Sequence, residues 1–325
     1  MRALAVEEPG SIDNLKIVEV PKLEPLPGQV RVKVHAVGLN PVDYKLIENP
    51  LPEWEYPHIS GLDAAGVIDN VGTGVTGWKP GDKVFFHGSL AHQGGFAEYT
   101  LAAEKVLAPL PERWSFTEAA ALPTPALTAY QALHRKLTMK RGQTIMIQAG
   151  AGAVGGFAIQ LASLAGLNII TTCSPGNNEH VMQLGAHKVI DYNTENVVEE
   201  VHRYTDGRGV DIAMDMVGKQ TATDAFDYLA FNGHLLCAVE LPDFSQYDPK
   251  TLAPSIHEIA LGFVYRSDDK EQIVDLGNMA KEVGQLAAAN KIIPMVEKEI
   301  SLENIPEGLQ RIKKGRVRGN IVARI

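Results

Sequence analysis

Short runs of alternating apolar and polar residues fill the first third of the chain. In residues 29–35, three valines fall on one side of the chain and charged or polar residues on the other, which is the pattern of a half-buried β-strand. Turns containing glycine or proline separate this run from further strand-like runs at 64–71, 83–86 and 96–100. Many short strands separated by such turns are typical of a small β-barrel. We expect no helix of any length before about Thr117.

Strand-like and helix-like runs alternate in the middle of the chain, from a helical stretch at 127–136 onward. The expected strands lie at 144–148, 168–173, 188–190, 210–216, 234–239 and 259–264. The expected helices include 178–184, 196–205 and 221–229. Alternation at this spacing indicates right-handed βαβ crossovers, which build a parallel sheet.

The end of the chain predicts a helix at 273–290, followed by a strand, a helix and a final strand that ends at Ile325. These last strands are more like those of the first third than those of the middle, so we expect them to return to the barrel. The predicted fold class is therefore α/β. A doubly wound parallel sheet is expected over 121–265, and a discontinuous β-barrel domain over 1–120 and 266–325.

Three glycines in the spacing G-x-G-x-x-G follow the strand at 144–148, and a helical period begins directly after them. In a dinucleotide site the first glycine permits a tight turn, the second lets the backbone approach a pyrophosphate, and the third lets the helix pack close to the strand. The helix N-terminus adds N–H groups and partial positive charge. Glycines alone would indicate only a tight turn, but here the strand and the helix are both present. The residues expected around the phosphates are Gly150, Gly152, Ala153, Val154 and Gly155.

The composition and the net charge of the chain limit the classes of molecule that it is expected to bind. The chain has 325 residues, 45% of them hydrophobic and 21% charged, and a net charge of -9. That charge disfavours nucleic acid and anionic membrane surfaces as partners, because both would repel it. No signal segment begins at Met1, and no apolar run is long enough to span a bilayer. The two cysteines, Cys173 and Cys237, lie in apolar strand-like runs. We therefore expect buried thiols in a reducing cytoplasm.

Several motifs, in order along the whole chain, carry a family resemblance. They are VGLNPVD at 37–43, GLDAAGV at 61–67, KPGDKV at 79–84, GGFAEY at 94–99, AALP at 120–123, LTAY at 127–130, the glycine turn at 149–155 and DMVG at 215–218. With these motifs the chain resembles the zinc-free quinone oxidoreductase branch of the medium-chain dehydrogenase/reductase superfamily. The resemblance implies a GroES-like barrel and a Rossmann domain with the active site in a cleft between them. It also implies a homodimer or homotetramer.

Zinc-dependent relatives place a cysteine near the end of the first motif and a His-Glu pair after the first glycine of the second. Here those positions hold Asn40 and Leu62-Asp63, and no cysteine precedes Cys173. A catalytic zinc needs about three protein ligands. His87 and His92 are close in sequence but lack a third ligand nearby, and both are expected to be loop histidines that face solvent. We therefore predict no metal.

The lack of zinc ligands constrains the chemistry. Hydride removal from an unactivated alcohol needs a Lewis acid or another acid to stabilise the alkoxide. Hydride donation to a quinone or an α,β-unsaturated carbonyl is easier, because the product anion is a delocalised phenolate or enolate. The protein then orients the reactants and supplies a few hydrogen-bond donors, and the nicotinamide carries the difficult step.

The strand at 168–173 bears on the choice of coenzyme. In an NAD site, an acidic residue about 20 positions beyond the glycines binds the ribose 2′-hydroxyl, but the only acid near this strand tip is Glu179, inside the next helix. The uncharged donors near this helix start suit a 2′-phosphate, so we predict NADPH rather than NADH. Alternatively, the two asparagines form only a turn and an N-cap. The proposed donors are Ser174, Asn177 and Asn178, and by resemblance Tyr192 lies near the same phosphate.

Three residues are candidates for the reacting end of the site. By resemblance, Asn40 lies at the nicotinamide and substrate end of the cleft, although it could equally be a turn residue before Pro41. Tyr44 has a hydroxyl that could donate to a substrate oxygen, or its ring could pack at the barrel rim. Thr128 matches a threonine near the nicotinamide in the family, and is otherwise an ordinary helix residue. No general acid is evident, so the proton is expected to come from solvent.

Other candidates lie where strands of the parallel sheet end, because such sheets bind ligands at the carboxyl ends of their strands. Val217 and Gly218 follow one strand, and Val239 ends the next. Weaker matches to family contacts are Phe263, Val264 and Asn320.

Three hypotheses follow for the function. The first is a zinc-free NADPH-dependent reductase of quinones or enones. The second is an alkenal or enone double-bond reductase, which the same kind of cleft would serve. The third is an NADPH-binding protein without a catalytic role, of the crystallin-like or regulatory kind.

Overall fold

The computed structural model describes residues 1–248, 250–267 and 269–325. The chain forms two compact units. The first unit combines Met1–Leu127 with Gly262–Ile325, and the second is Thr128–Leu261.

These bounds differ by a few residues from the expected changeovers at 121 and 265. Helix α3, Pro123–Tyr130, begins in the first unit and ends in the second. It continues as a π-helical turn, Gln131–Arg135. Because α3 begins at Pro123, helical structure starts earlier than in the helix expected at 127–136.

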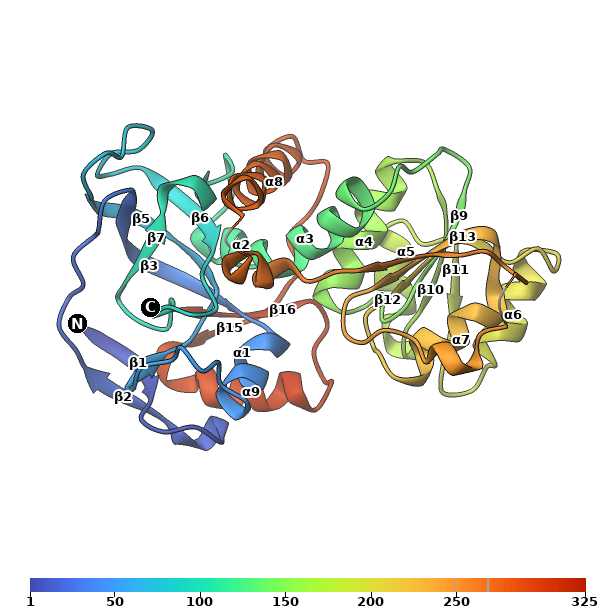
Figure 1. Ribbon diagram of the computed structural model, residues 1–325, viewed down its shortest axis with the longest axis horizontal. Helices are drawn as coiled ribbons and strands as arrows, with labels where there is room; N and C mark the ends of the chain where they lie inside the picture. The colour runs from blue at the N-terminus through green and yellow to red at the C-terminus, as the bar shows by residue number, and fades with distance from the viewer. Residues whose placement is uncertain (249, 268) are drawn as a thin grey trace. The chain divides into compact units, whose positions relative to one another are not determined.

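The first unit is built on a largely antiparallel sheet of the order β15-β16-β3-β5-β6-β8, with β7 paired to β3 (Figure 1). β16 pairs antiparallel with β3, so that Ile321 lies opposite Leu39. The last strands therefore return to the barrel, as predicted. The strands of this sheet are β3 (Gln29–Leu39), β5 (Asp63–Val71), β6 (Lys83–His87), β7 (Tyr99–Ala103), β8 (Ala108–Pro109), β15 (Val296–Ser301) and β16 (Asn320–Arg324).

A smaller sheet and several α-helices also belong to the first unit. Its strand order is β2-β1-β4, with β1 between the other two. The strands are β1 (Arg2–Val6), β2 (Leu15–Glu19) and β4 (His58–Ile59). The helices are α1 (Pro41–Glu48), α2 (Phe116–Ala120), α8 (Lys270–Ala288) and α9 (Ile305–Lys313). Helix α8 lies against the backbone near Lys105, since a Cβ added at Gly277 would come 1.8 Å from the Lys105 carbonyl oxygen.

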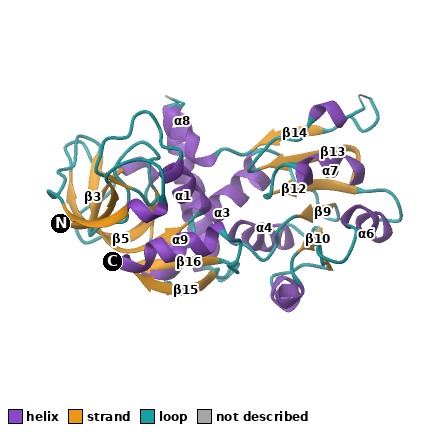
Figure 2. Cartoon of the chain, turned by 90° about the horizontal axis from the view of Figure 1, so that it is seen from below, coloured by secondary structure: helices purple, strands orange, loops and turns teal. Residues whose placement is uncertain are grey.

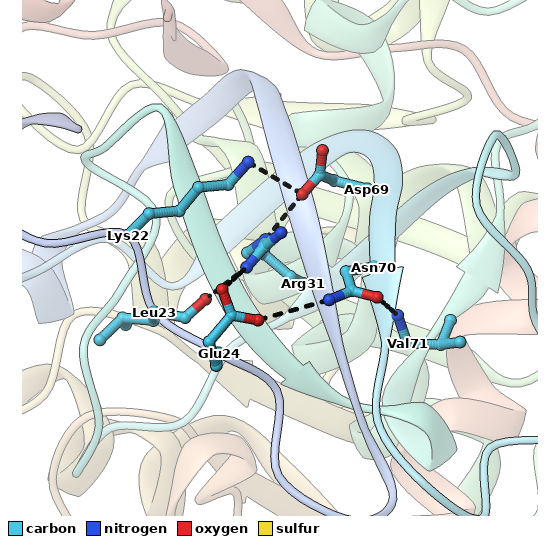
Figure 3. Close-up of polar contacts among 7 residues, drawn as sticks. All are labelled: Lys22, Leu23, Glu24, Arg31, Asp69, Asn70 and Val71. Carbon is cyan, nitrogen blue, oxygen red and sulfur yellow. Dashed lines mark hydrogen bonds and ion pairs between the residues drawn. The ribbon is translucent and has the colours of Figure 1, made fainter.

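Strand β3 has the predicted apolar face, and its polar face is exposed at Lys33 but buried at Arg31. Its valines are buried, and so is Arg31, which is only 8% exposed. The Arg31 guanidinium contacts Asp69 Oδ2 at 2.6 Å, Glu24 Oε1 at 2.7 Å and the Leu23 carbonyl at 2.9 Å (Figure 3). An arginine is tolerated at such depth because its donors are paired. This Arg31 cluster ties the segment before β3 to β5.

Helix α1 contradicts the expectation that no helix precedes Thr117. Asn40 is its N-cap, Pro41 occupies the first helical position, and the Asp43 carboxylate accepts the Asn40 backbone N–H at 2.7 Å. Proline at N1 and a side chain that reaches back to the N-cap are helix-start signals. The expectation that Asn40 could be a turn residue before Pro41 overlooked them.

The second unit is a parallel sheet of the order β11-β10-β9-β12-β13-β14, with the helices between successive strands. This is the doubly wound dinucleotide-binding order, with the reversal between β9 and β12. Figure 2 shows β14, β13, β12, β9 and β10 in a row. The strands are β9 (Thr144–Ile147), β10 (Asn168–Thr172), β11 (Lys188–Ile190), β12 (Val210–Asp215), β13 (Leu229–Cys237) and β14 (Ser255–Glu258). The helices are α4 (Ala153–Leu164), α5 (Asn178–Gln183), α6 (Val197–Tyr204) and α7 (Gln220–Tyr228).

The sixth strand does not lie at 259–264 as expected. β14 ends at Glu258, and Leu261–Arg266 is a 3₁₀ helix. Ile259 donates its N–H to the Cys237 carbonyl and is 5% exposed, so its apolar side chain is buried directly after the strand. A short apolar run fits a buried strand and a buried helical turn equally well, which explains the error.

Within the described ranges, no helix is both long enough and apolar enough to cross a membrane.

Candidate functional site

The glycine turn joins β9 to α4 in the second unit. Ala149 has a φ of +52°, and the Gly150 N–H donates to the Thr172 carbonyl at 2.9 Å. The Gly152 N–H closes the turn on the Ala149 carbonyl at 3.0 Å. Gly152 is the N-cap of α4, with φ -74° and ψ 167°. The turn therefore leads directly from the strand into the first helical turn.

Each glycine of the motif has different surroundings. A Cβ at Gly150 would come 2.0 Å from Thr171 Oγ1, and one at Gly155 would come 2.4 Å from the Ala149 carbonyl oxygen. Both glycines are therefore required by close packing. A Cβ at Gly152 would meet only the Ala149 carbonyl oxygen, at 3.4 Å, so this glycine is not required by contacts inside the protein. Gly152 has the open outer side that a pyrophosphate needs.

The first turn of α4 suits an anion. Ala153 and Val154 are half-buried, and the glycine N-cap brings no side chain to the helix start. The first N–H groups of a helix lack partners within the helix and carry partial positive charge. This turn could hold phosphates on its backbone amides.

The tip of β10 brings two of the predicted phosphate donors together. The Asn177 side-chain amide donates to Ser174 Oγ at 3.0 Å, and both residues are partly exposed. Asn178 is exposed, but its Oδ1 accepts the Cys173 thiol at 3.4 Å. Glu179 accepts the Gln183 amide at 3.2 Å on the surface of α5. No acidic residue stands at the strand tip itself.

The alternative prediction was that Asn177 and Asn178 form only a turn and an N-cap, and the structure agrees with it in part. Asn177 is the N-cap of α5, but its side chain makes no capping hydrogen bond. Its amide is instead joined to Ser174. Tyr192 follows β11 and is 56% exposed, in a turn where Asp191 Oδ1 accepts the Asn193 N–H at 3.0 Å.

The carboxyl ends of β12 and β13 present exposed apolar side chains. Val217 is 49% exposed and Val239 is 41% exposed. Gly218, between them in sequence, is buried with a φ of +83°. A Cβ at Gly218 would lie 3.1 Å from Val239 Cγ1, so Gly218 and Val239 are in contact. Apolar groups left in solvent at this edge of a parallel sheet are consistent with a ligand site.

In the first unit, Asn40 belongs to a buried polar cluster. Its Nδ2 donates to Asp63 Oδ2 at 2.8 Å, and Asp63 also accepts the Thr124 hydroxyl at 2.6 Å and the Thr124 N–H at 2.8 Å. Asp63 is fully buried, and Asn40 is 3% exposed. Burial raises the pKa of Asp63 to about 7, although the hydrogen bonds from Thr124 and Asn40 oppose the rise. Burial also raises the pKa of Asp43 well above its ordinary value.

Asn40 is thus both a helix N-cap and a member of this cluster. Sequence reasoning missed Asp63 as its partner, because Asp63 was considered only as a replaced zinc position. Thr124 was missed as well, since it lies 61 positions from Asp63 and no local pattern joins them.

Tyr44, Thr128 and Asn320 are the remaining candidates from helices α1 and α3 and strand β16. Tyr44, in α1, is half-buried with the Lys313 ammonium 5.9 Å from its ring centre. Burial and the Glu48 carboxylate raise the pKa of Tyr44, so its hydroxyl keeps its proton at neutral pH. Thr128 is 9% exposed in α3, and Asn320 is 2% exposed in β16.

Phe263 and Val264 lie in the 3₁₀ helix that replaces the expected strand, and Phe263 is 52% exposed.

The two histidines considered as metal ligands differ. His92 is exposed and its Nδ1 lies 2.9 Å from Ser89 Oγ. His87 is in strand β6 and only 2% exposed, which contradicts the expectation that it faces solvent. Burial lowers the pKa of His87 to about 4, and its ring stacks on Tyr265. Over the described residues, no group of three or more His, Cys, Asp or Glu side chains is arranged to hold a metal ion.

Comparison with known families supports both units. The family model for the alcohol dehydrogenase GroES-like domain matches residues 26–112, and the model for zinc-binding dehydrogenases matches residues 153–276. The second description covers zinc-binding members. At the positions where zinc-dependent relatives are expected to carry a cysteine and a His-Glu pair, this chain has Asn40 and Leu62-Asp63.

Individual proteins agree along the whole chain. The human quinone oxidoreductase is 30% identical over 324 residues, covering 97% of this chain and 94% of its own length. The quinone oxidoreductase of Pseudomonas syringae pv. Tomato DC3000 superimposes with a TM-score of 0.90 at 26% identity, covering 100% of this chain and 99% of its own. The JamJ enoyl reductase superimposes with a TM-score of 0.87 at 25% identity, covering 99% and 98%. With the two family models and the doubly wound strand order, these matches show that the chain belongs to the quinone oxidoreductase branch of the medium-chain dehydrogenase/reductase superfamily.

Proposed function

We propose that this protein is a zinc-independent, NADPH-dependent oxidoreductase that transfers hydride to a quinone or an α,β-unsaturated carbonyl. The superfamily to which it belongs binds nicotinamide coenzymes. The observation that carries the proposal is the β9–α4 turn. Close packing requires Gly150 and Gly155, whereas a Cβ at Gly152 would meet only the Ala149 carbonyl oxygen, at 3.4 Å.

The tip of β10 supports NADPH over NADH. An acid at this position would accept the ribose 2′-hydroxyl of NADH and repel a 2′-phosphate. Here the tip carries the hydroxyl of Ser174 and the amide of Asn177. Both are uncharged and can donate to a phosphate. Tyr192 offers a further exposed hydroxyl after the neighbouring strand.

The side chains of the first unit support acceptor binding without a metal. Asp63 fixes the amide of Asn40 through a 2.8 Å hydrogen bond, so the amide is oriented before a substrate arrives. Tyr44, kept protonated by its raised pKa, would donate to an oxygen on which negative charge develops. Thr128 and the apolar Val217 and Val239 are proposed to contact the nicotinamide end. The weaker contacts proposed are Phe263, Val264 and Asn320.

The chemistry needs little else from the protein. When bound, the reduced nicotinamide supplies the hydride. A quinone or enone takes that hydride to give a phenolate or enolate, which a proton from solvent then neutralises. The chain's own residues bind the coenzyme phosphates, orient the acceptor and hold donors near its oxygen.

A direct test measures kcat/KM for a panel of quinones, alkenals and cyclic enones, each with NADPH and with NADH. The proposal expects turnover of at least one acceptor class with a higher kcat/KM for NADPH. A preference for NADH would refute the coenzyme assignment. A stoichiometric zinc found by elemental analysis, and required for turnover, would refute the metal-free mechanism.

The panel also separates the alternatives. Reduction confined to enones and alkenals would favour a double-bond reductase, and the similarity to an enoyl reductase structure supports keeping this alternative. Tight NADPH binding with no turnover of any acceptor would favour a non-catalytic NADPH-binding protein.

The cellular compartment, the oligomeric state and the partners of the protein are also part of the proposal. The thiols of Cys173 and Cys237 are both free and buried, which supports a reducing compartment such as the cytoplasm. We propose a homodimer or homotetramer, with no nucleic acid or membrane partner. Light scattering after gel filtration tests the assembly, and a monomer at micromolar concentration would refute it.

A further inference from the structure

Asp215 stands at the end of β12, directly before the turn that carries Val217 and Gly218. It is 1% exposed. Its Oδ2 accepts the Gly218 N–H at 2.8 Å, and its Oδ1 accepts the Thr221 hydroxyl at 2.7 Å. The two carboxylate oxygens therefore hold both sides of the turn from β12 into α7.

Further contacts fix the same turn. Thr221 Oγ1 also lies 2.7 Å from the Gly218 carbonyl oxygen, and the Lys219 N–H donates to Glu240 Oε2 at 3.0 Å. Gln148, the residue before the glycine turn, donates to the Thr221 carbonyl at 3.2 Å. The start of α7 is thus linked to the end of β9 as well as to the end of β13.

The backbone of this turn is held in an unfavourable form. Gly218 has a φ of +83°, and Lys219 has a φ of +56° with a ψ of -128°. A residue with a side chain adopts such angles at an energetic cost, and persists there only when its surroundings enforce them. Strained residues of this kind are concentrated at ligand sites. The fixed turn leaves Val217 exposed at the carboxyl edge of the sheet.

We propose that Asp215 is a positioning residue for the nicotinamide half of the coenzyme, acting through Gly218 and Thr221 to hold the turn at Val217 and Gly218. This inference rests on the proposed function. A doubly wound sheet binds a dinucleotide across two mononucleotide-binding halves. The strands β9, β10 and β11 belong to the adenosine half, so β12 and β13 serve the other half.

The test compares binding of the whole coenzyme with binding of its adenosine half alone. The Kd values of NADPH and of 2′,5′-ADP are measured by calorimetry for the wild type and for Asp215→Asn, Thr221→Val and Thr221→Ser. Gly218 and Thr221 donate to different carboxylate oxygens. Asn keeps an oxygen at only one of these positions and presents N–H at the other, and Val removes the hydroxyl at nearly constant shape. We expect both variants to weaken NADPH by about tenfold or more, as loss of a hydrogen bond to a charged group does, and to leave the Kd of 2′,5′-ADP within about twofold.

Matched controls separate positioning from folding. Thr221→Ser keeps the hydroxyl and should restore NADPH binding. Gln220→Ala removes only a surface contact to Asp224, 2.8 Å long, in the same helical turn, and should bind both ligands as the wild type does. If Asp215→Asn does not fold, Thr221→Val and Thr221→Ser still test the positioning role, because only Thr221→Ser keeps the hydroxyl that contacts Asp215.

The outcomes distinguish this inference from the function on which it rests. Equal losses for NADPH and 2′,5′-ADP, or no loss for either, would overturn the role of Asp215 while the wild type still binds coenzyme. NADH and 5′-AMP, which lack the 2′-phosphate, are measured in parallel. A wild type that binds only NADH and 5′-AMP refutes the preference for NADPH, and the role of Asp215 is then tested with these two ligands. A wild type that binds neither coenzyme refutes the proposed function and this inference together.

Discussion

Two alanine substitutions in the glycine turn separate a residue needed for packing from one needed for ligand. At Gly155 the new Cβ would lie 2.4 Å from the Ala149 carbonyl oxygen and 2.8 Å from Gly150 Cα. Both neighbours are backbone atoms and cannot rotate away. At Gly152 the only neighbour is the Ala149 carbonyl oxygen at 3.4 Å, an ordinary contact, and the backbone angles suit any residue.

The magnitudes follow from these distances. In helix α4, Gly→Ala gains about 1 kcal/mol of helix propensity, but overpacking of a tight core costs about 1–3 kcal/mol, with the upper end expected against backbone. We therefore expect Gly155→Ala to lose about 1–2 kcal/mol of unfolding free energy. At Gly152, the loss of a good N-cap, about 0.5–1 kcal/mol, is offset by the reduced freedom of the unfolded chain, about 0.4–1 kcal/mol. The net change should stay within about 0.5 kcal/mol.

Thermal unfolding without ligand and coenzyme titration give the two readouts. Gly155→Ala should lower the Tm by several degrees. Gly152→Ala should keep the wild-type Tm but weaken NADPH by at least about tenfold, or 1.4 kcal/mol, because its methyl group projects where the pyrophosphate must approach. Wild-type affinity in Gly152→Ala would refute the placement of the phosphates. Wild-type stability in Gly155→Ala would refute the packing argument.

Three further predictions concern charge. The raised pKa of Asp63 means that the folded chain holds a proton that the unfolded chain releases, so stability should fall as pH rises from 3.8 to about 7, by up to about 4 kcal/mol. Denaturant melts across this range should show a smaller slope for Asp63→Asn, and an unchanged slope would contradict the assignment. Arg31→Met should cost about 1–3 kcal/mol, because it leaves Asp69 paired with Lys22 alone and removes the donor of the Leu23 carbonyl. Arg324→Gln, in an ion pair whose side chains are 69% and 40% exposed, should change stability by less than about 1 kcal/mol. Ser174→Asp should move the NADPH-to-NADH ratio of kcat/KM toward NADH by about tenfold or more, and an unchanged ratio would show that β10 does not read the 2′ position.

Local sequence signals were enough for the second unit. The glycine turn, the helix after it and the alternation of strands predicted the doubly wound sheet, because each signal lies within one βαβ unit. The proposal that Gly152 lies at the phosphates came from spacing alone. The sixth strand could not be placed, since the apolar run at 259–264 has the same composition in a strand as in the 3₁₀ helix that it forms.

The polar cluster of Asn40, Asp63 and Thr124 could not be predicted from the sequence, for a different reason. Asn40 and Asp63 are 23 positions apart, and Asp63 and Thr124 are 61 apart. Their meeting depends on how β3, β5 and α3 are placed in the fold, and no periodicity encodes that. In contrast, Asp215, Gly218 and Thr221 lie within seven positions. Asp215 was used only as part of a family motif, and Thr221 was not considered as its partner.

The pairing of β16 with β3 has a consequence for how the protein is made. Strand β16, Asn320–Arg324, pairs with residues 36–39 of β3, although nearly 300 residues separate the two strands in the sequence. The second unit is complete in sequence at Leu261 and can fold during synthesis, since domains generally fold as units. The main sheet of the first unit cannot be completed before β16 has been made. Until then residues 36–39 of β3 lack this partner strand and are open to pairing with other chains, so a chain that lacks β16 is expected to be prone to aggregation while its second unit is intact.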